Sequence, residues 1–205
     1  MYNRVCLFGA GGHGRVVAQQ IIARWPAAKL CFGDTRKPCG IDVNGVPVTF
    51  AAAEHVKEGH LIVTIGDNVL RCRLQRAATA SGVEMGYFIA DPERFFALPP
   101  GGGSMILAGA IVTSNVRIGA GVIVNSGAII EHDSDIGDFC HLAPGSILAG
   151  GTVLGPRVFV GAGARIINEA HIPGDTVIGA GSTVVSSIAQ PGIYIGSPAK
   201  CIRLV

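Results

Sequence analysis

The strongest candidate for acid–base chemistry is His132, which stands in the polar segment Ile130-Glu-His-Asp133. Histidine exchanges a proton readily near neutral pH, so His132 could act as the general base that deprotonates an attacking nucleophile. A nearby carboxylate would hold the ring and raise its basicity, and either Asp133 or Glu131 could supply one. The competing interpretation is an ordinary surface histidine on a polar turn. We predict a general base at His132, partnered by Asp133.

A second candidate is the glycine-rich segment Gly9-Ala-Gly-Gly-His-Gly14, which follows an expected strand and opens an expected helix. It satisfies the pattern G-x-G-x-x-G, and Asp34 ends the next expected strand about twenty residues on, as in dinucleotide-binding segments. Backbone N–H groups and a helix N-terminus in such a loop attract phosphate groups. A tight turn without a ligand is the alternative. The pattern therefore predicts a phosphate-bearing ligand at this loop.

The remaining histidines and the cysteines indicate no metal site. His132, His141 and His171 are spaced nine and thirty residues apart, unlike the closely spaced histidines of many zinc sites. We expect His171, His55 and His60 to be structural or solvated. The six cysteines include no C-x-x-C pair, which fits reduced, mostly buried thiols. We therefore expect no metal cofactor.

After the segment Pro99-Pro-Gly-Gly-Gly103 the chain follows a six-residue period, and the residue four places after each aliphatic is small or Val. The branched aliphatics are Ile106, Val112, Ile118, Val124, Ile130, Ile136, Leu142, Leu148, Leu154, Val160, Ile166, Ile172, Ile178 and Val184. This period fits a three-sided prism of short strands with aliphatics inside, and with Gly, Asn or Asp at corners that need positive φ. Repeats of this class wind left-handed, against the usual crossover rule, although the period alone does not set the hand.

The prism constrains the position of His141, which lies nine residues after His132. Nine residues span at most ~30 Å and must bend around a corner, so the two histidines should lie on different sides of one prism. A prism of this size exposes flat apolar faces, which a trimer with a threefold axis would cover. We therefore predict a homotrimer in which His132 of one chain meets His141 of a neighbour.

The first part of the chain alternates apolar strands with helix-like stretches. We expect strands at Val5–Phe8, Leu30–Phe32 and Leu61–Ile65, and helices at Arg15–Arg24 and from about Asn68 to Ala80. Trp25-Pro26 should end the first helix, and the alternation favours a small parallel sheet covered by helices. The predicted fold is an α/β Rossmann-like domain over residues 1–100, followed by a left-handed parallel β-helix of hexapeptide repeats with a C-terminal tail over residues 101–205.

Composition excludes several other classes of protein. The net charge of +2 is too small to predict binding to nucleic acid or to an anionic membrane surface. No apolar run approaches the ~20 residues of a membrane span, and the N-terminus lacks the long apolar core of a signal peptide. We expect a soluble, cytoplasmic protein with neither nucleic-acid nor membrane partners.

These features together resemble the NeuD/PglD-like family of sugar O- and N-acetyltransferases over nearly the whole chain. The resemblance rests on the hexapeptide series, the Phe8–Gly14 loop, Thr64-Ile-Gly-Asp-Asn68, Ile130–Asp133 and Gly196-Ser-Pro-Ala-Lys200. It is weakest at residues 89–104, where Phe95-Phe-Ala-Leu-Pro-Pro departs from the usual pattern. The resemblance implies that acetyl-CoA, the co-substrate, lies along the β-helix between subunits, and that the N-terminal domain, a sugar-nucleotide-binding domain, holds a nucleotide sugar.

The resemblance also implies roles for residues on the donor side of the site. Asp133 takes the acidic position after the catalytic histidine, where many relatives carry Glu. His141 matches a histidine near the acetyl-CoA thioester, with a packed histidine on the outer wall as the alternative. Ala162 and Ala180 match backbone contacts to CoA, although every hexad contains small residues.

On the acceptor side, the resemblance implies that the glycine-rich loop cradles the diphosphate of the nucleotide sugar. The contacts would be Gly11, Gly12 and His13, with Gly33, Asp34 and Gly66 lining the same pocket. Asn125 matches an asparagine that could bond the substrate or the acyl group, with a positive-φ corner residue as the alternative.

We expect N-acetylation of the 4-amino group of a nucleotide-linked amino-dideoxy sugar, by direct transfer because no cysteine sits beside His132. One alternative is O-acetylation of sialic acid or a related sugar. Another is an NAD(P)-binding oxidoreductase that uses the β-helix as an oligomerisation stalk, and a third is a non-catalytic scaffold.

Overall fold

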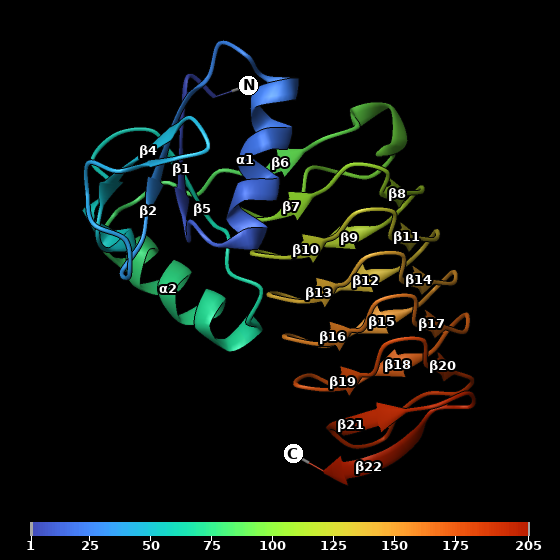
Figure 1. The fold of residues 1–205 in the computed structure, drawn as a ribbon. Coiled ribbons are helices and arrows are strands. Elements are labelled where there is room, and N and C mark those ends of the chain that lie inside the picture. The colour runs from blue at the N-terminus through green and yellow to red at the C-terminus, as the bar shows by residue number, and fades with distance from the viewer. Residues whose placement is uncertain (1, 205) are drawn as a thin grey trace.

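The N-terminal part of the protein is a small α/β sheet, in a computed structural model that describes residues 2–204 (Figure 1). Its strands are β1 (Arg4–Phe8), β2 (Lys29–Gly33), β3 (Asp42–Val43), β4 (Val46–Phe50) and β5 (His60–Val63), in the order β3-β4-β2-β1-β5. β1 pairs in parallel with β2 and β5, which confirms the predicted parallel sheet. The antiparallel pair β3–β4 was not predicted, although Asn44-Gly45, both at positive φ, is a strong hairpin signal.

Two long helices lie where they were expected. α1 (Gly12–Arg24) begins in the glycine-rich loop and ends just before Trp25-Pro26, and α2 (Asn68–Ala80) matches its predicted range. The Asp67 side chain caps α2 by accepting from the Leu70 amide at 2.7 Å. Two short 3-10 helices, η1 (Ala53–His55) and η2 (Pro92–Arg94), lie in the connections. No helix within residues 2–204 is long and apolar enough to cross a membrane.

The C-terminal part is the predicted left-handed β-helix, a stack of three-sided coils. Its two-residue strands are β7 (Met105–Ile106), β8 (Ile111–Val112), β9 (Arg117–Ile118), β10 (Ile123–Val124), β11 (Ile129–Ile130), β12 (Asp135–Ile136), β13 (His141–Leu142), β14 (Ile147–Leu148), β15 (Val153–Leu154), β16 (Phe159–Val160), β17 (Arg165–Ile166), β18 (His171–Ile172), β19 (Val177–Ile178) and β20 (Thr183–Val184). Residues 18 apart pair in parallel, as Ile123 does with His141.

The strands form three faces. The first face has the strand order β22-β21-β19-β16-β13-β10-β7-β6, the second β20-β17-β14-β11-β8, and the third β18-β15-β12-β9. β6 (Phe88–Ile89) opens the first face, and β21 (Gly192–Ile195) with β22 (Lys200–Leu204) closes it. The segment that departs from the family pattern extends the second face, because the Phe96 amide donates to the Val112 carbonyl at 2.9 Å.

The interior of the prism is built as the six-residue period predicts. All fourteen aliphatics of the series are at most 5% exposed, and the small residues between them are also buried. Within residues 2–204, one corner residue in every six from 103 to 181 adopts positive φ, mostly Gly, Asn or Asp as expected. The exceptions are Phe139, Arg157 and Glu169; Arg157 is held at its corner by two hydrogen bonds to the Asp175 carboxylate.

Helix α2 docks the N-terminal sheet onto the upper coils of the β-helix, while the last coils extend below it (Figure 1). Its Asn68, Arg71 and Gln75 side chains donate to backbone carbonyls along one corner of the prism. These carbonyls point out of the coils and need donors, so a polar helix face satisfies them. The docking places the glycine-rich loop opposite the first face, at the level of β13.

Candidate active site

His132 lies at the corner between the second and third faces, directly after β11, with its side chain 61% exposed. Its Nδ1 lies 2.7 Å from Asp133 Oδ2, and the Asn115 side-chain amide donates to Asp133 Oδ1 at 2.6 Å. The hydrogen bonds from Asn115 and then from His132 lower the pKa of Asp133. Glu131 contacts Thr113 instead, at 3.4 Å. The structure thus joins His132 to Asp133, with Asn115 holding the carboxylate from behind.

Gly150 lies beneath the His132 ring, one coil further on. A Cβ atom at Gly150 would lie 2.7 Å from His132 Cε1, a distance that no real contact tolerates. Within residues 2–204, His132 Nε2 has no hydrogen-bond partner while Nδ1 is held by Asp133. Sequence reasoning missed both Asn115 and Gly150, although adding or subtracting 18 residues along the stacked coils would have found them.

A second cluster gathers around His141, which is buried on β13 of the first face. His141 Nδ1 lies 3.2 Å from the Gly66 carbonyl and Nε2 lies 3.2 Å from Asn125 Nδ2. The carbonyl must accept and the amide must donate, which places the ring proton on Nδ1. Burial lowers the pKa of His141 to about 4, so this imidazole is neutral at pH 7.

Asn125 is not a corner residue, so the alternative interpretation of a positive-φ asparagine is wrong. The neighbouring corner belongs to Gly127. The Asn125 side-chain oxygen accepts from the Ser126 amide at 2.9 Å, which fixes the orientation of the side-chain amide. One N–H of that amide points to His141 and the second remains for another acceptor.

His13 joins this cluster from the first turn of α1. Its ring centroid lies 6.2 Å from that of His141, and its Nε2 is buried without a hydrogen-bond partner among residues 2–204. Burial lowers the pKa of His13 to about 4, so it is neutral at pH 7. A buried, unpaired ring nitrogen costs free energy unless a ligand completes it. His13, Gly66, Asn125 and His141 therefore form one polar site where the glycine-rich loop meets β13.

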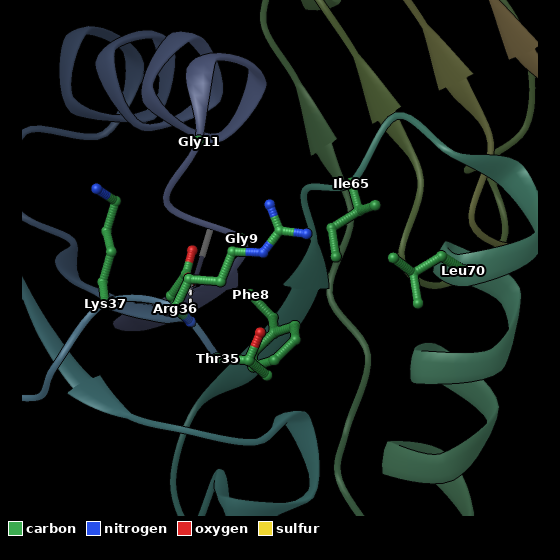
Figure 2. Close-up of a pocket in the computed structure, with 9 residues that line it drawn as sticks. Phe8, Gly9, Gly11, Thr35, Arg36, Lys37, Ile65 and Leu70 are labelled. Atoms are coloured by element: carbon green, nitrogen blue, oxygen red, sulfur yellow. Dashed lines mark hydrogen bonds between the residues drawn. The ribbon is translucent and has the colours of Figure 1, made fainter.

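The glycine-rich loop borders a cavity of about 460 Å³ (Figure 2). It is lined by Phe8, Gly9, Gly11, Asp34, Thr35, Arg36, Lys37, Ile65 and Leu70. Gly11 and Gly12 are exposed with open space where a side chain would stand, whereas Gly14 packs so closely on the Gly9 carbonyl that no Cβ fits.

Asp34 supports the loop, because its carboxylate accepts from the Ala10 amide at 2.8 Å and from the Arg36 amide at 2.7 Å. Gly33 lies behind the loop: its carbonyl accepts from the Gly9 amide, and its Cα packs on the Phe50 ring. Figure 2 shows the Arg36 side chain extending past Gly9, with Lys37 nearby. Sequence reasoning missed these two cations, which give the cavity the charge that suits phosphates.

Ala162 and Ala180 are exposed and stacked at the corner between the first and second faces. The Gly181 amide donates to the Ala162 carbonyl at 2.8 Å, which connects the two turns. His132 stands at a different corner, and no hydrogen bond within residues 2–204 links it to the His141 cluster. The prediction that His132 and His141 lie on different sides of the prism is confirmed, since β11 belongs to the second face and β13 to the first.

Comparison with known families agrees with this architecture. The family model for the PglD N-terminal domain matches residues 4–78, and that for the bacterial transferase hexapeptide (six repeats) matches residues 133–168. A search of curated proteins found no match.

Several solved structures resemble the chain over nearly its full length. PerB from Caulobacter crescentus, in complex with CoA and GDP-perosamine, is 36% identical, with 96% of each chain covered and a TM-score of 0.83. A variant of perosamine N-acetyltransferase from the same organism, with the same two ligands, is 34% identical, with 96% of this chain and 95% of that chain covered and a TM-score of 0.87. The acetyltransferase domain of PglB from Neisseria gonorrhoeae is 29% identical, with 98% and 100% covered and a TM-score of 0.85.

The fold and the site therefore define an acyltransferase of the hexapeptide-repeat class. The chain belongs to the NeuD/PglD-like family of sugar acetyltransferases, and the acetyltransferase domain of PglB has been solved in complex with acetyl coenzyme A. Membership of this family favours the predicted acetyltransferase over the alternative of an NAD(P)-binding oxidoreductase. Within residues 2–204, no group of three or more His, Cys, Asp or Glu side chains could hold a metal ion.

Proposed function

We propose that the protein N-acetylates the 4-amino group of a nucleotide-linked amino-dideoxy sugar, with His132 as general base and sites between the subunits of a homotrimer. The observation that carries the proposal is the hydrogen-bonded chain Asn115–Asp133–His132, which leaves one imidazole nitrogen free at the surface of the β-helix. PerB, a 36% identical protein solved with CoA and GDP-perosamine, supports the choice of acceptor.

The base step follows from the geometry of His132. With Nδ1 bonded to the Asp133 carboxylate, Nε2 carries the lone pair and can take a proton from the attacking amine. The carboxylate stabilises the imidazolium that forms, and Asn115 together with the Gly150 surface holds the ring in place. The amine nitrogen bonds to the thioester carbonyl carbon, the C–S bond breaks, and CoA leaves as a thiol after taking up a proton.

The His141 cluster is suited to the acyl group. Because His141 Nε2 accepts from Asn125, its only ring N–H points to Gly66 and away from the reacting carbonyl. The second N–H of Asn125 is therefore the better donor to the oxyanion that develops in the tetrahedral intermediate. His141 would orient this amide, and its low pKa keeps it a neutral acceptor.

The acceptor pocket is suited to a diphosphate. The exposed backbone of Gly11 and Gly12 at the N-terminus of α1 offers N–H groups, and Arg36 and Lys37 add positive charge. His13, with its unpaired buried Nε2, can bond the ligand where the pocket meets the first face. Asp34 and Gly33 hold the loop from behind through hydrogen bonds from the Ala10 and Gly9 amides, and Gly66 lies in the neighbouring His141 cluster.

The separation of the two clusters supports a shared site. In one chain, His132 is exposed at one corner and the His141 cluster lies on the opposite face, so neither is complete alone. A threefold arrangement would bring the His132 corner of one chain to the first face of its neighbour, beside Ala162 and Ala180, where CoA would lie.

The proposal is tested by incubating the purified protein with acetyl-CoA and a panel of nucleotide-linked sugars while measuring thiol release. Each 4-amino sugar is paired with the 4-hydroxy sugar of the same nucleotide, and we expect turnover with the amine alone. His132→Ala should lower kcat by about 10²–10⁴, whereas His55→Ala, at an exposed histidine remote from the β-helix, should not. Transfer to the hydroxyl sugars instead, or a loss below tenfold in His132→Ala, would contradict the proposal.

A further inference from the structure

Two cysteines face each other across neighbouring strands of the N-terminal sheet, away from the acetyl-transfer site. Cys6 on β1 pairs directly with Cys31 on β2, and their Sγ atoms lie 3.4 Å apart. Paired strands lie ~4.8 Å apart, within the ~4.4–6.8 Å between Cα atoms that a disulfide spans. The sulfurs need to approach by only about 1.4 Å to reach bonding distance.

Both cysteines line a cavity of about 360 Å³ that is distinct from the one beside the glycine-rich loop. Its other walls are Arg4, Thr49, Phe50, His55, Val56, Lys57 and Glu58. The Arg4 guanidinium pairs with the Glu58 carboxylate at 3.1 Å, which leaves Lys57 as excess positive charge. The two thiols are buried, at 3% and 5% exposure, but they are adjacent to a space that admits a small polar reagent.

The surroundings assign different roles to the two sulfurs. The hydrogen bond between the two thiols, with further help from Thr49 and Arg4, lowers the pKa of Cys31 to about 6 despite burial. The same hydrogen bond and burial raise the pKa of Cys6, whose sulfur also lies 3.6 Å from the Glu58 carbonyl. The lowered pKa favours Cys31 as the nucleophile of the pair, with Cys6 as the thiol that resolves it.

We propose that Cys6 and Cys31 form a redox-active dithiol that hydroperoxides oxidise to an intramolecular disulfide. The Cys31 thiolate attacks the peroxide oxygen, breaks the O–O bond and becomes a sulfenic acid while hydroxide leaves and is protonated to water. The Cys6 sulfur then attacks the Cys31 sulfur, and the sulfenic oxygen leaves as a second water with the Cys6 proton. Two thiols and one hydrogen peroxide thus give one disulfide and two waters, and a dithiol reductant reverses the change.

Other cysteines of the chain provide internal controls. Cys39 and Cys201 are exposed, and Cys72 is buried. Cys140 is also buried, inside the β-helix, where burial raises its pKa to about 12. A reaction governed by exposure alone would select Cys39 and Cys201, whereas the proposed dithiol would react ahead of Cys72 and Cys140.

The test uses the full-length Cys39→Ser/Cys201→Ser protein, treated with hydrogen peroxide under native conditions and analysed by mass spectrometry. We expect a mass loss of about 2 Da, a crosslinked peptide pair containing Cys6 and Cys31, and reversal by dithiothreitol. Adding Cys6→Ser should stop the reaction at a Cys31 sulfenic acid that dimedone traps, and adding Cys31→Ser should abolish both products. Circular dichroism confirms that each variant is folded.

Two results would overturn the proposal. One is that both thiols remain alkylatable after a peroxide exposure that oxidises Cys39 and Cys201 in the wild-type chain. The other is that dimedone labels Cys72 or Cys140 rather than Cys31 in the Cys6→Ser background. Neither readout depends on acetyl transfer, so these results test the redox-active dithiol independently of the proposed acetyltransferase function.

Discussion

Replacing Arg71 by methionine should destabilise the junction between the N-terminal sheet and the β-helix more than any other single change on α2. Arg71 is fully buried, and no carboxylate within residues 2–204 forms an ion pair with it. Its guanidinium donates instead to Gly121, Ile65, Gly66, Phe139 and Cys140 carbonyls and to the Asn68 side chain. Burial lowers the pKa of Arg71 to about 10, which still leaves it charged at pH 7.

The magnitude follows from the carbonyls that would lose their donor. Among the described residues, the carbonyls of Ile65, Gly121 and Phe139 accept from Arg71 alone. Each buried acceptor left unpaired costs ~1–3 kcal/mol, which gives a gross loss of ~3–9 kcal/mol. Removing the buried cation returns several kcal/mol of desolvation, so we expect a net loss of about 3 kcal/mol and a fall in Tm of roughly 6–12 °C.

The assay is equilibrium denaturation at fixed protein concentration, with Arg73→Met as the matched control. Arg73 lies on the same helix but is exposed, so its replacement should change stability by less than ~0.5 kcal/mol. Arg71→Lys retains the positive charge but lacks the planar set of guanidinium N–H donors, so its loss of stability should lie between those of Arg71→Met and Arg73→Met. A loss below ~1 kcal/mol in Arg71→Met, or an equal loss in Arg73→Met, would refute the reasoning.

Three further predictions concern the two clusters of the site. Asp133→Asn should lower kcat by about 10–100-fold with little change in KM for the acceptor, because the ring loses its charged partner; a preserved kcat would contradict this. Gly150→Ala should lower kcat by about 10²-fold, since its Cβ displaces the His132 ring; unchanged steady-state kinetics would count against the contact. For His141, the unfolded chain takes up a proton near its usual pKa of 6.5, whereas burial delays uptake in the folded state to about 4. Stability should therefore fall as pH drops from 6.5 to 4, and His141→Asn should lose less over this range in denaturation curves; an equal loss would argue against a buried neutral ring.

The β-helix could be predicted because its signal is local and repeated. Each aliphatic from Ile106 to Val184 fills the interior for the same reason, so one rule explains every coil. The same stacking rule extends to polar positions of the site. Asn115 lies 18 residues before Asp133, and Gly150 lies 18 residues after His132, so each stacks on its partner in the neighbouring coil.

The junction between the two parts could not be predicted in this way. Arg71 is an ordinary helix residue in the sequence, and its partners are backbone carbonyls that any residue types would provide. Likewise, the contact of His141 with Gly66 joins residues 75 apart in the chain. Such contacts depend on how the two parts of the chain pack together, and residue spacing within either part does not predict that geometry.

We propose that each active site takes His132 from one chain, and the glycine-rich loop with the His141 cluster from its neighbour. Mixing two inactive variants tests this shared site most directly. His132→Ala removes the base, and Gly11→Asp places a carboxylate in the open space where a diphosphate would lie. Gly11→Ala, which adds no charge, serves as the control and should lose less activity than Gly11→Asp.

The two inactive variants are unfolded, mixed in equal amounts and refolded, and acetyl transfer is measured by thiol release. In randomly mixed trimers, three quarters contain both chains and one interface in three pairs two intact halves, so about a quarter of wild-type activity should return. Mixtures that stay inactive, while wild-type chains refolded in the same way recover, would show that each site belongs to a single chain.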